Sequence, residues 1–314
     1  MYDVKAIYEA SSIQNAIELL KDHPEAKIIA GGSDILISIR NGSLKDAELV
    51  SIYGLDELRG IAIDSEGTIK IGALTSFSHI AKDPIINENI KVLAEAVDMV
   101  GGPQIRNIGT IGGNVCNGVT SADSASTLMA FDAIMEIEGP EGIREISIKE
   151  WYIKAKQVAL KPCEILTSIK IKKESYEGYK GHYIKYAMRN AMDIATIGCS
   201  VNVKLSRDTI TFEDVRIAYG VAGPVPMRAI LAEEFLRGKA VNEENINAFS
   251  EKVLEDINPR DSWRAGKEFR EHLCKILAKR ALTEAVKLNN ETAKPNNETT
   301  KFKNETAKLN GGEF

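Results

Sequence analysis

The sequence has few of the residues on which many enzymes depend. Its four cysteines form no C-x-x-C pair, so the chain alone predicts neither a zinc ribbon nor an iron–sulfur cluster. Its four histidines are far apart in sequence, and nothing favours a Ser–His–Asp catalytic site. The chain is therefore poor in catalytic side chains, and we predict no catalytic residue and no metal ligand within it.

The sequence also lacks targeting and membrane signals. No run approaches the roughly 18 apolar residues of a membrane span. The first residues, MYDVKAIYEASS, have neither a basic n-region nor an apolar h-region, so we expect a cytoplasmic protein without a signal peptide. The net charge of −5 argues against a nucleic-acid partner. A length of 314 residues, 44% of them hydrophobic, fits two or three modest globular domains.

Glycine and short polar side chains gather in one stretch, residues 101–123, which reads GGPQIRNIGTIGGNVCNGVTSAD. Glycine has no Cβ and tolerates positive φ, so such a stretch lets the backbone come close to a ligand. Successive N–H groups in such turns can form concave anion sites. No lysine follows the glycines and GTIGGN does not fit G-x-G-x-x-G, which excludes a nucleoside-triphosphatase phosphate loop and the Rossmann fingerprint.

A second glycine pair strengthens this interpretation. Residues 27–34 read KIIAGGSD, an apolar strand that runs into Gly31-Gly32 and then into a small polar pair. Such a strand end can deliver backbone donors to a pyrophosphate. Two such loops predict a dinucleotide gripped from two sides.

Hydrophobic periodicity gives the expected elements. Helices are expected at residues 11–22, beginning with a capping box from Ser11 to Gln14, and at 75–80, 87–100, 125–131, 229–236, 243–257 and 263–286. Strands are expected at residues 27–30, 50–52, 68–74, 133–138, 143–148, 164–172, 182–188, 195–205 and 215–221. The last three strands predict an antiparallel sheet. Three near-copies of one heptad, LNNETAK, PNNETTK and FKNETAK, lack the apolar a and d positions of a coiled coil, so residues 288–314 are expected to form a disordered tail.

Four collinear motifs carry a resemblance to a known family. They are KIIAGGSDILI, GPQIRNIGTIGGNVCNGVTSADSA, KYAMRNAMDIATIGC and SWRAGKEFREHL. Together they resemble the FAD-binding subunit of bacterial xanthine dehydrogenases, in the molybdenum hydroxylase family, over residues 1–287. The resemblance implies an α+β fold, in which a two-subdomain FAD-binding unit of the vanillyl-alcohol-oxidase-like (PCMH) type precedes a C-terminal antiparallel-sheet-and-helix domain. The corresponding divisions are residues 1–54 and 55–175 for the two subdomains and 176–287 for the C-terminal domain.

The loops and the resemblance together give candidate FAD-binding residues. Lys27, Ile28 and Ile29 are expected to line the strand edge, and Ala30, Gly31, Gly32, Ser33 and Asp34 to offer N–H groups and a hydroxyl to the pyrophosphate. Thr110, Ile111, Gly112, Gly113 and Asn114 are expected to form the second wall, with Asn117 and Asp123 bonding the ribityl and adenosine side. The resemblance adds Ile165 or Leu166 packing on the flavin, and Lys185 at the pyrimidine end of the ring.

Each singled-out side chain also has a simpler interpretation. Asp123 fits the N-cap of the helix that follows it. Lys185 fits an exposed charge on an edge strand. Arg106 fits either a surface charge or a salt bridge that holds the glycine-rich stretch. The first glycine loop has no histidine or cysteine, so we expect the FAD to be non-covalent.

The resemblance implies an oxidoreductase subunit of a molybdenum-containing purine (xanthine) dehydrogenase. Its FAD would take electrons from 2Fe–2S clusters on one partner chain, fed by a molybdopterin chain, and pass them to NAD. The expected assembly is a heterotrimer or a dimer of heterotrimers. Three alternatives stay open: a stand-alone FAD-dependent reductase of the enolpyruvyl-glucosamine reductase type, the FAD subunit of a hydroxylase for another N-heterocycle such as nicotinate, and a nucleotide-binding regulatory subunit. The substrate pocket would lie on another chain, so the sequence leaves the heterocycle open.

Overall fold

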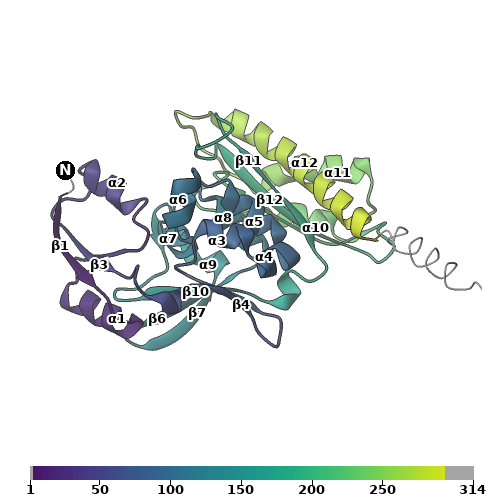
Figure 1. The fold of residues 1–314 in the computed structure, drawn as a ribbon. Helices are drawn as coiled ribbons and strands as arrows, with labels where there is room; N and C mark the ends of the chain where they lie inside the picture. Colours follow the sequence, from purple (N-terminus) through teal and green to yellow (C-terminus); the bar gives the residue numbers. More distant parts are fainter. Residues whose placement is uncertain (1–2, 294–314) are drawn as a thin grey trace, which may run out of the picture.

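The computed structural model describes residues 3–293 and builds them around three main sheets (Figure 1). The first is a parallel sheet of three strands in the order β1 (Val4–Glu9), β3 (Ala47–Ser51) and β2 (Lys27–Ile29). Its helices are α1 (Ile13–Asp22) and α2 (Ile35–Arg40). Helix α1 buries Ala16, Ile17 and Leu20 against the sheet. The expected capping box is wrong by one residue, because Ser12 is the N-cap and accepts a hydrogen bond from the Asn15 amide at 3.1 Å.

The second sheet is antiparallel. Its five strands follow the order β4 (Ile61–Ile63), β5 (Ile69–Gly72), β10 (Ile165–Ile171), β6 (Ile134–Gly139) and β7 (Gly142–Ser147). Strands β6 and β7 form the hairpin expected around Gly139–Gly142. The small elements nearby are η1 (Asp56–Leu58), α9 (Ile148–Trp151), β8 (Tyr152–Lys154), β9 (Gln157–Val158) and η2 (Lys173–Ser175).

Short helices accompany this sheet, and three expectations for them need correction. They are α3 (Phe77–Lys82), α4 (Pro84–Asn89), α5 (Lys91–Asp98), α6 (Pro103–Ile108), α7 (Ile111–Cys116) and α8 (Asp123–Ala130). The single helix expected at 87–100 is two, because Asp83 caps α4 with Pro84 at its start and the chain breaks at Ile90. Ser76, not Thr75, caps α3. The glycine-rich stretch, expected as a loop, contains α6 and α7.

The third sheet is antiparallel, as the sequence predicts, in the order β11 (Lys180–Tyr186), β12 (Ile197–Leu205), β13 (Phe212–Gly220) and β14 (Met227–Arg228). Helix α8 packs on one face of β12 and β13, where Asn202 donates to the carbonyl of Ala130. The other face of β12 packs against α12 (Lys267–Ala293), which Figure 1 shows lying along the sheet. Helices α10 (Ile230–Leu236) and α11 (Glu243–Lys252), followed by η3 (Val253–Glu255), complete this layer.

Helix α8 is the buried centre of the molecule. All eight of its residues are buried between the second and third layers, among them the small Ser124, Ala125 and Ser126. Small side chains let helix and sheet approach closely, and burial of all eight residues leaves this helix no exposed face. The expected α+β class is confirmed.

The start of the predicted tail is not disordered. Helix α12 runs to Ala293, and Asn289 in its last turns donates to the carbonyl of Val203 on β12 at 3.3 Å. Residues 294–314, the rest of the predicted tail, lie outside the described residues. Within residues 3–293, no helix has the length and apolar character needed to cross a membrane.

Candidate cofactor-binding site

The two glycine loops meet directly. A Cβ placed on Gly31 would lie 1.9 Å from the carbonyl oxygen of Ile108 and 3.3 Å from the Gly109 nitrogen. No side chain can occupy that space, so only glycine lets the loop after β2 lie against the end of α6. The two loops that the sequence predicts to grip a dinucleotide therefore lie against each other, and their contact with a dinucleotide stays a prediction.

The first loop offers a run of free donors. Within residues 3–293, the backbone N–H groups of residues 31–35 donate to no protein acceptor, and the Ser33 hydroxyl has no partner. Gly32 takes the left-handed conformation, with φ of 75°, which curves this run before α2 begins. Consecutive unpaired N–H groups on a curved backbone are a concave anion site, and they fit a pyrophosphate. Lys27 and Asp34 are exposed, while Ile28, Ile29 and Ala30 are half-buried beside the loop.

The second loop contributes to the shape of the site more than it contributes backbone hydrogen-bond donors. At the start of α7 the amide of Ile111 donates to the carbonyl of Thr75, that of Gly112 to Ala73, and that of Gly113 to Oγ1 of the capping Thr110. These donors are therefore already paired. Gly112 is packed, since an added Cβ would lie 2.6 Å from the Ala73 oxygen. Gly113 is exposed, and its Cβ would meet only Thr110 Oγ1, at 2.9 Å, so Gly113 is the wall residue that faces open space.

Two asparagines of the glycine-rich stretch differ in their contacts. Asn114 accepts a hydrogen bond from the Ser124 hydroxyl at 2.7 Å and so ties α7 to α8. The Asn117 side chain is half-buried at the end of α7 and has no protein partner within the described chain. Asn117 is thus free to bond a ligand, whereas Asn114 already has a structural role.

Asp123 and Lys185 form a buried pair. Lys185 Nζ lies 2.8 Å from Asp123 Oδ2 and donates to the Met99 carbonyl at 2.9 Å. Tyr183 donates its hydroxyl to Asp123 Oδ1 at 2.8 Å. The Lys185 and Asp123 side chains are 9% and 6% exposed, so the interpretation of Lys185 as an exposed charge is wrong even though β11 is an edge strand. Asp123 is not an N-cap either, because Ala122 holds that position.

Burial dominates the electrostatics of this pair. Burial raises the pKa of Asp123, although Lys185 and Tyr183 oppose that shift. Burial and the Asp123 charge raise the pKa of Tyr183 well above its usual range, so Tyr183 stays a hydrogen-bond donor. Sequence reasoning missed Tyr183. Its signal was available, because Tyr183 lies two residues before Lys185 and shares its face of the strand.

The side chains of the remaining residues that the sequence singled out pack in the core or hold other parts of the chain in place. Ile165 packs with the core of the first sheet and Leu166 with that of the second, and both are buried. Their contact with a flavin therefore stays a prediction. Arg106 holds the glycine-rich stretch, because it pairs with Asp98 at 3.1 Å and donates to the carbonyls of Val100 and Gly101.

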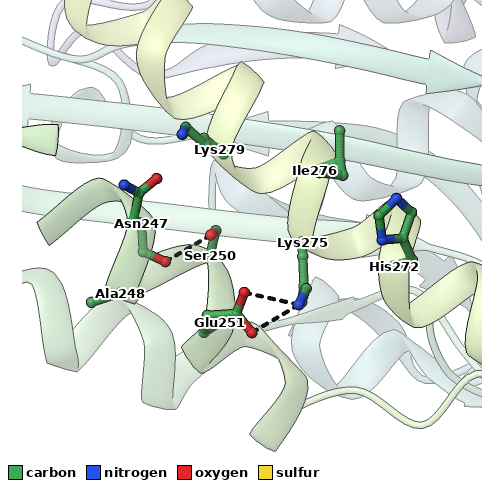
Figure 2. A pocket seen from close by; sticks show the side chains of 8 residues that line it. All are labelled: Asn247, Ala248, Ser250, Glu251, His272, Lys275, Ile276 and Lys279. Atoms are coloured by element: carbon green, nitrogen blue, oxygen red, sulfur yellow. Dashed lines mark hydrogen bonds and ion pairs between the residues drawn. The ribbon is translucent and has the colours of Figure 1, made fainter. Parts of the chain in front are cut away.

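A separate groove lies between α11 and α12, and Figure 2 shows the side chains that line it. Glu251 and Lys275 form an ion pair across it. None of the candidate residues lines this groove, so we assign it no part in cofactor binding. Within residues 3–293, no group of three or more His, Cys, Asp or Glu side chains could hold a metal ion.

Comparison with known proteins gives the family of the chain. Residues 2–172 match the family model of the FAD binding domain in molybdopterin dehydrogenase, and residues 182–285 match that of the CO dehydrogenase flavoprotein C-terminal domain. A putative xanthine dehydrogenase FAD-binding subunit of Escherichia coli K12 is 41% identical over 91% of this chain and 97% of its own length.

A second sequence relative and one solved structure are also similar to this chain over most of its length. The nicotinate dehydrogenase FAD-subunit of Eubacterium barkeri is 33% identical over 78% of this chain and 81% of its own. A solved carbon monoxide dehydrogenase structure from Hydrogenophaga pseudoflava superposes with a TM-score of 0.86 at 28% identity, covering 92% of this chain and 99% of that one. The chain therefore belongs to the family of FAD-binding subunits of molybdenum hydroxylases.

Proposed function

We propose that this chain is the electron-exit subunit of a molybdenum-containing xanthine dehydrogenase. In this role its FAD takes electrons from 2Fe–2S clusters on one partner chain and passes them to NAD, while a molybdopterin chain oxidises the purine. The observation that carries the proposal is the 41% identity, over nearly the whole of both chains, to a subunit named for xanthine dehydrogenase. We keep residues 1–54, 55–175 and 176–287 as the proposed divisions, since each main sheet lies within one of them.

The first glycine loop is proposed to bind the pyrophosphate. The five free N–H groups of residues 31–35 and the Ser33 hydroxyl supply donors without any lysine. A charge-assisted hydrogen bond to an anion is roughly twice as strong as a neutral one. The contact of Gly31 with Ile108 holds this loop against the second wall, where Gly113 leaves room for the dinucleotide. We keep Asn117 as the donor or acceptor for the ribityl and adenosine side.

Lys185 is proposed to reach the pyrimidine end of the flavin. An ammonium group has three donors, and Asp123 and Met99 take two of them, which leaves one for the flavin. Asp123 then acts as a positioning residue, because its carboxylate fixes the ammonium while Tyr183 fixes the carboxylate. When bound, the isoalloxazine ring supplies the redox chemistry, and these residues orient it.

A second candidate has its own support. The 33% identity to a nicotinate dehydrogenase FAD-subunit favours a related hydroxylase acting on another N-heterocycle. The two candidates share the same role for this chain and differ in the substrate of a partner chain. Relatives named medium chains of carbon monoxide and glyceraldehyde dehydrogenases also fit a role as one subunit of several.

The proposal is tested by assaying the half-reaction of the chain alone and the full reaction of the assembled chains separately. The FAD-loaded chain alone is expected to pass electrons from NADH to a dye, since hydride transfer needs only positioning against an open ring face. It is expected not to oxidise xanthine or nicotinate. Co-expression with the two partner chains of the same source should give xanthine-dependent reduction of NAD. Turnover with nicotinate but not xanthine would select the second candidate. No NADH-to-dye activity in a FAD-replete chain would count against NAD as the acceptor.

A further inference from the structure

The hydroxyl of Tyr183 lies in a space that a glycine leaves open. Tyr183 is 1% exposed on β11, and the neighbouring strand β12 carries Gly198 directly opposite Lys185. A Cβ added to Gly198 would lie 2.8 Å from the Tyr183 hydroxyl oxygen, whereas the nearest ring carbons would be 3.6 Å away. An alanine at residue 198 would therefore crowd the hydroxyl but meet the ring at an ordinary contact distance.

The Tyr183 hydroxyl holds one oxygen of a buried carboxylate. It donates to Asp123 Oδ1 at 2.8 Å, and Lys185 Nζ donates to Asp123 Oδ2 at the same distance. Within residues 3–293, no other side-chain donor bonds Oδ1. A buried acceptor that loses its donor is costly to leave unpaired. Without the Tyr183 hydroxyl, Asp123 would therefore need another donor.

Lys185 could supply that donor, but only by giving up its bond to a ligand. Its ammonium group has three N–H donors, of which Asp123 Oδ2 and the Met99 carbonyl take two. Because Lys185 is already bonded to one oxygen of the carboxylate, its third N–H is the donor at hand for Oδ1. The Tyr183 hydroxyl therefore keeps the third N–H of Lys185 available.

We propose that Tyr183 and Gly198 are positioning residues for Lys185 and so set how strongly the bound flavin favours its reduced form. This inference rests on the proposed function, in which Lys185 reaches the pyrimidine end of the flavin. Reduced flavin carries more negative charge at that end, so a hydrogen bond from an ammonium stabilises the reduced form more than the oxidised form. Gly198 makes room for the hydroxyl, the hydroxyl satisfies Asp123, and Asp123 holds Lys185 with one N–H free.

The test measures the reduction potential of FAD bound to the full chain, together with the dissociation constant of oxidised FAD. Tyr183→Phe is expected to lower the affinity for reduced FAD, relative to oxidised FAD, at least about tenfold, because one hydrogen bond to a charged group is lost. For a two-electron couple, a tenfold change is a fall of about 30 mV in the potential. Gly198→Ala should shift the potential in the same direction, because its Cβ displaces the hydroxyl.

The double variant Tyr183→Phe/Gly198→Ala distinguishes this role from a general loss of packing. Phenylalanine has no hydroxyl, so the nearest atoms of residue 183 to the added Cβ would be ring carbons at 3.6 Å. Adding Gly198→Ala to Tyr183→Phe should therefore change neither the potential nor the thermal midpoint any further. Gly198→Ala alone should lower both.

Tyr219→Phe is the matched control, because it removes a buried hydroxyl from the opposite face of the same sheet. Tyr219 lies on β13, is fully buried and donates to the Cys274 carbonyl of α12 at 2.9 Å. Whatever its effect on the thermal midpoint, this variant should keep the wild-type flavin potential.

The outcomes distinguish this inference from the proposal on which it rests. The wild-type potential in Tyr183→Phe and in Gly198→Ala, with a shift in Lys185→Gln, would overturn the positioning role alone. Additive effects of the two substitutions in the double variant would also overturn it. The wild-type potential in Lys185→Gln would show that Lys185 does not reach the flavin, and failure of the wild-type chain to bind FAD would overturn the proposed function. Either of these last results would remove the basis of this inference as well.

Discussion

Gly31→Ala tests whether the contact between the two glycine loops holds the cofactor site together. The added Cβ would lie 1.9 Å from the Ile108 carbonyl oxygen and 2.7 Å from its carbon. Both atoms belong to the backbone, so no side-chain rotation relieves the clash. Since ordinary contacts begin at 3.4 Å, the first loop would have to retreat by about 1.5 Å from the end of α6.

The expected loss of FAD affinity depends on whether the protein can relax the clash. Without FAD, the first sheet can shift away from α6 and relax part of the clash, but the bound dinucleotide needs both walls in place. Overpacking of this kind costs about 1–3 kcal/mol. Because about 1.4 kcal/mol is a factor of ten, the dissociation constant for FAD is expected to rise by roughly 5- to 150-fold.

The assay is a titration of the FAD-free chain with FAD, followed by flavin fluorescence. Gly54→Ala is the matched control, since its Cβ meets nothing within 4 Å and its φ is not positive. It should bind FAD as the wild type does. Wild-type FAD affinity in Gly31→Ala would refute the view that the loops act as one site.

Three further predictions concern other parts of the site and fold. Gly113→Val should abolish FAD binding while the circular dichroism spectrum stays native, because Gly113 faces the space assigned to the dinucleotide; normal occupancy would mean that this residue belongs only to a turn. Denaturation should release all flavin into the supernatant as FAD, and flavin left on the precipitated chain would show a covalent link. Burial raises the pKa of Glu136, but hydrogen bonds from Lys170, Lys70 and Ser168 lower it to about 2. A depressed carboxyl pKa gives stability above its unfolded value that is lost as the pH falls, so Glu136→Gln should cost about 1–2 kcal/mol at pH 7 and progressively less between pH 5 and 2 in urea unfolding. An equal cost at every pH would contradict this account.

The sequence by itself determined the features that depend on local chemistry. The Gly31-Gly32 pair after an apolar strand and the glycines of residues 101–123 mark places where the backbone approaches something closely, because no other residue lacks a Cβ. Three long β-type runs separated by turn residues predicted the antiparallel third sheet, because short turns join neighbouring antiparallel strands. The four sequence motifs indicated the family, and the comparisons confirm it.

Other features were decided only by the tertiary structure. The two glycine loops look alike in sequence, yet the first keeps its donors free while the amides that open α7 are paired with Ala73, Thr75 and Thr110. From the sequence alone, Asp123 could cap a helix or bind a ligand. In the folded protein, strand β11 places Lys185 and Tyr183, about 60 residues away in sequence, at its two carboxylate oxygens. Hydrogen-bond partners at that separation are set by how sheets and helices pack, and no pattern within one segment records which donors are still free after folding.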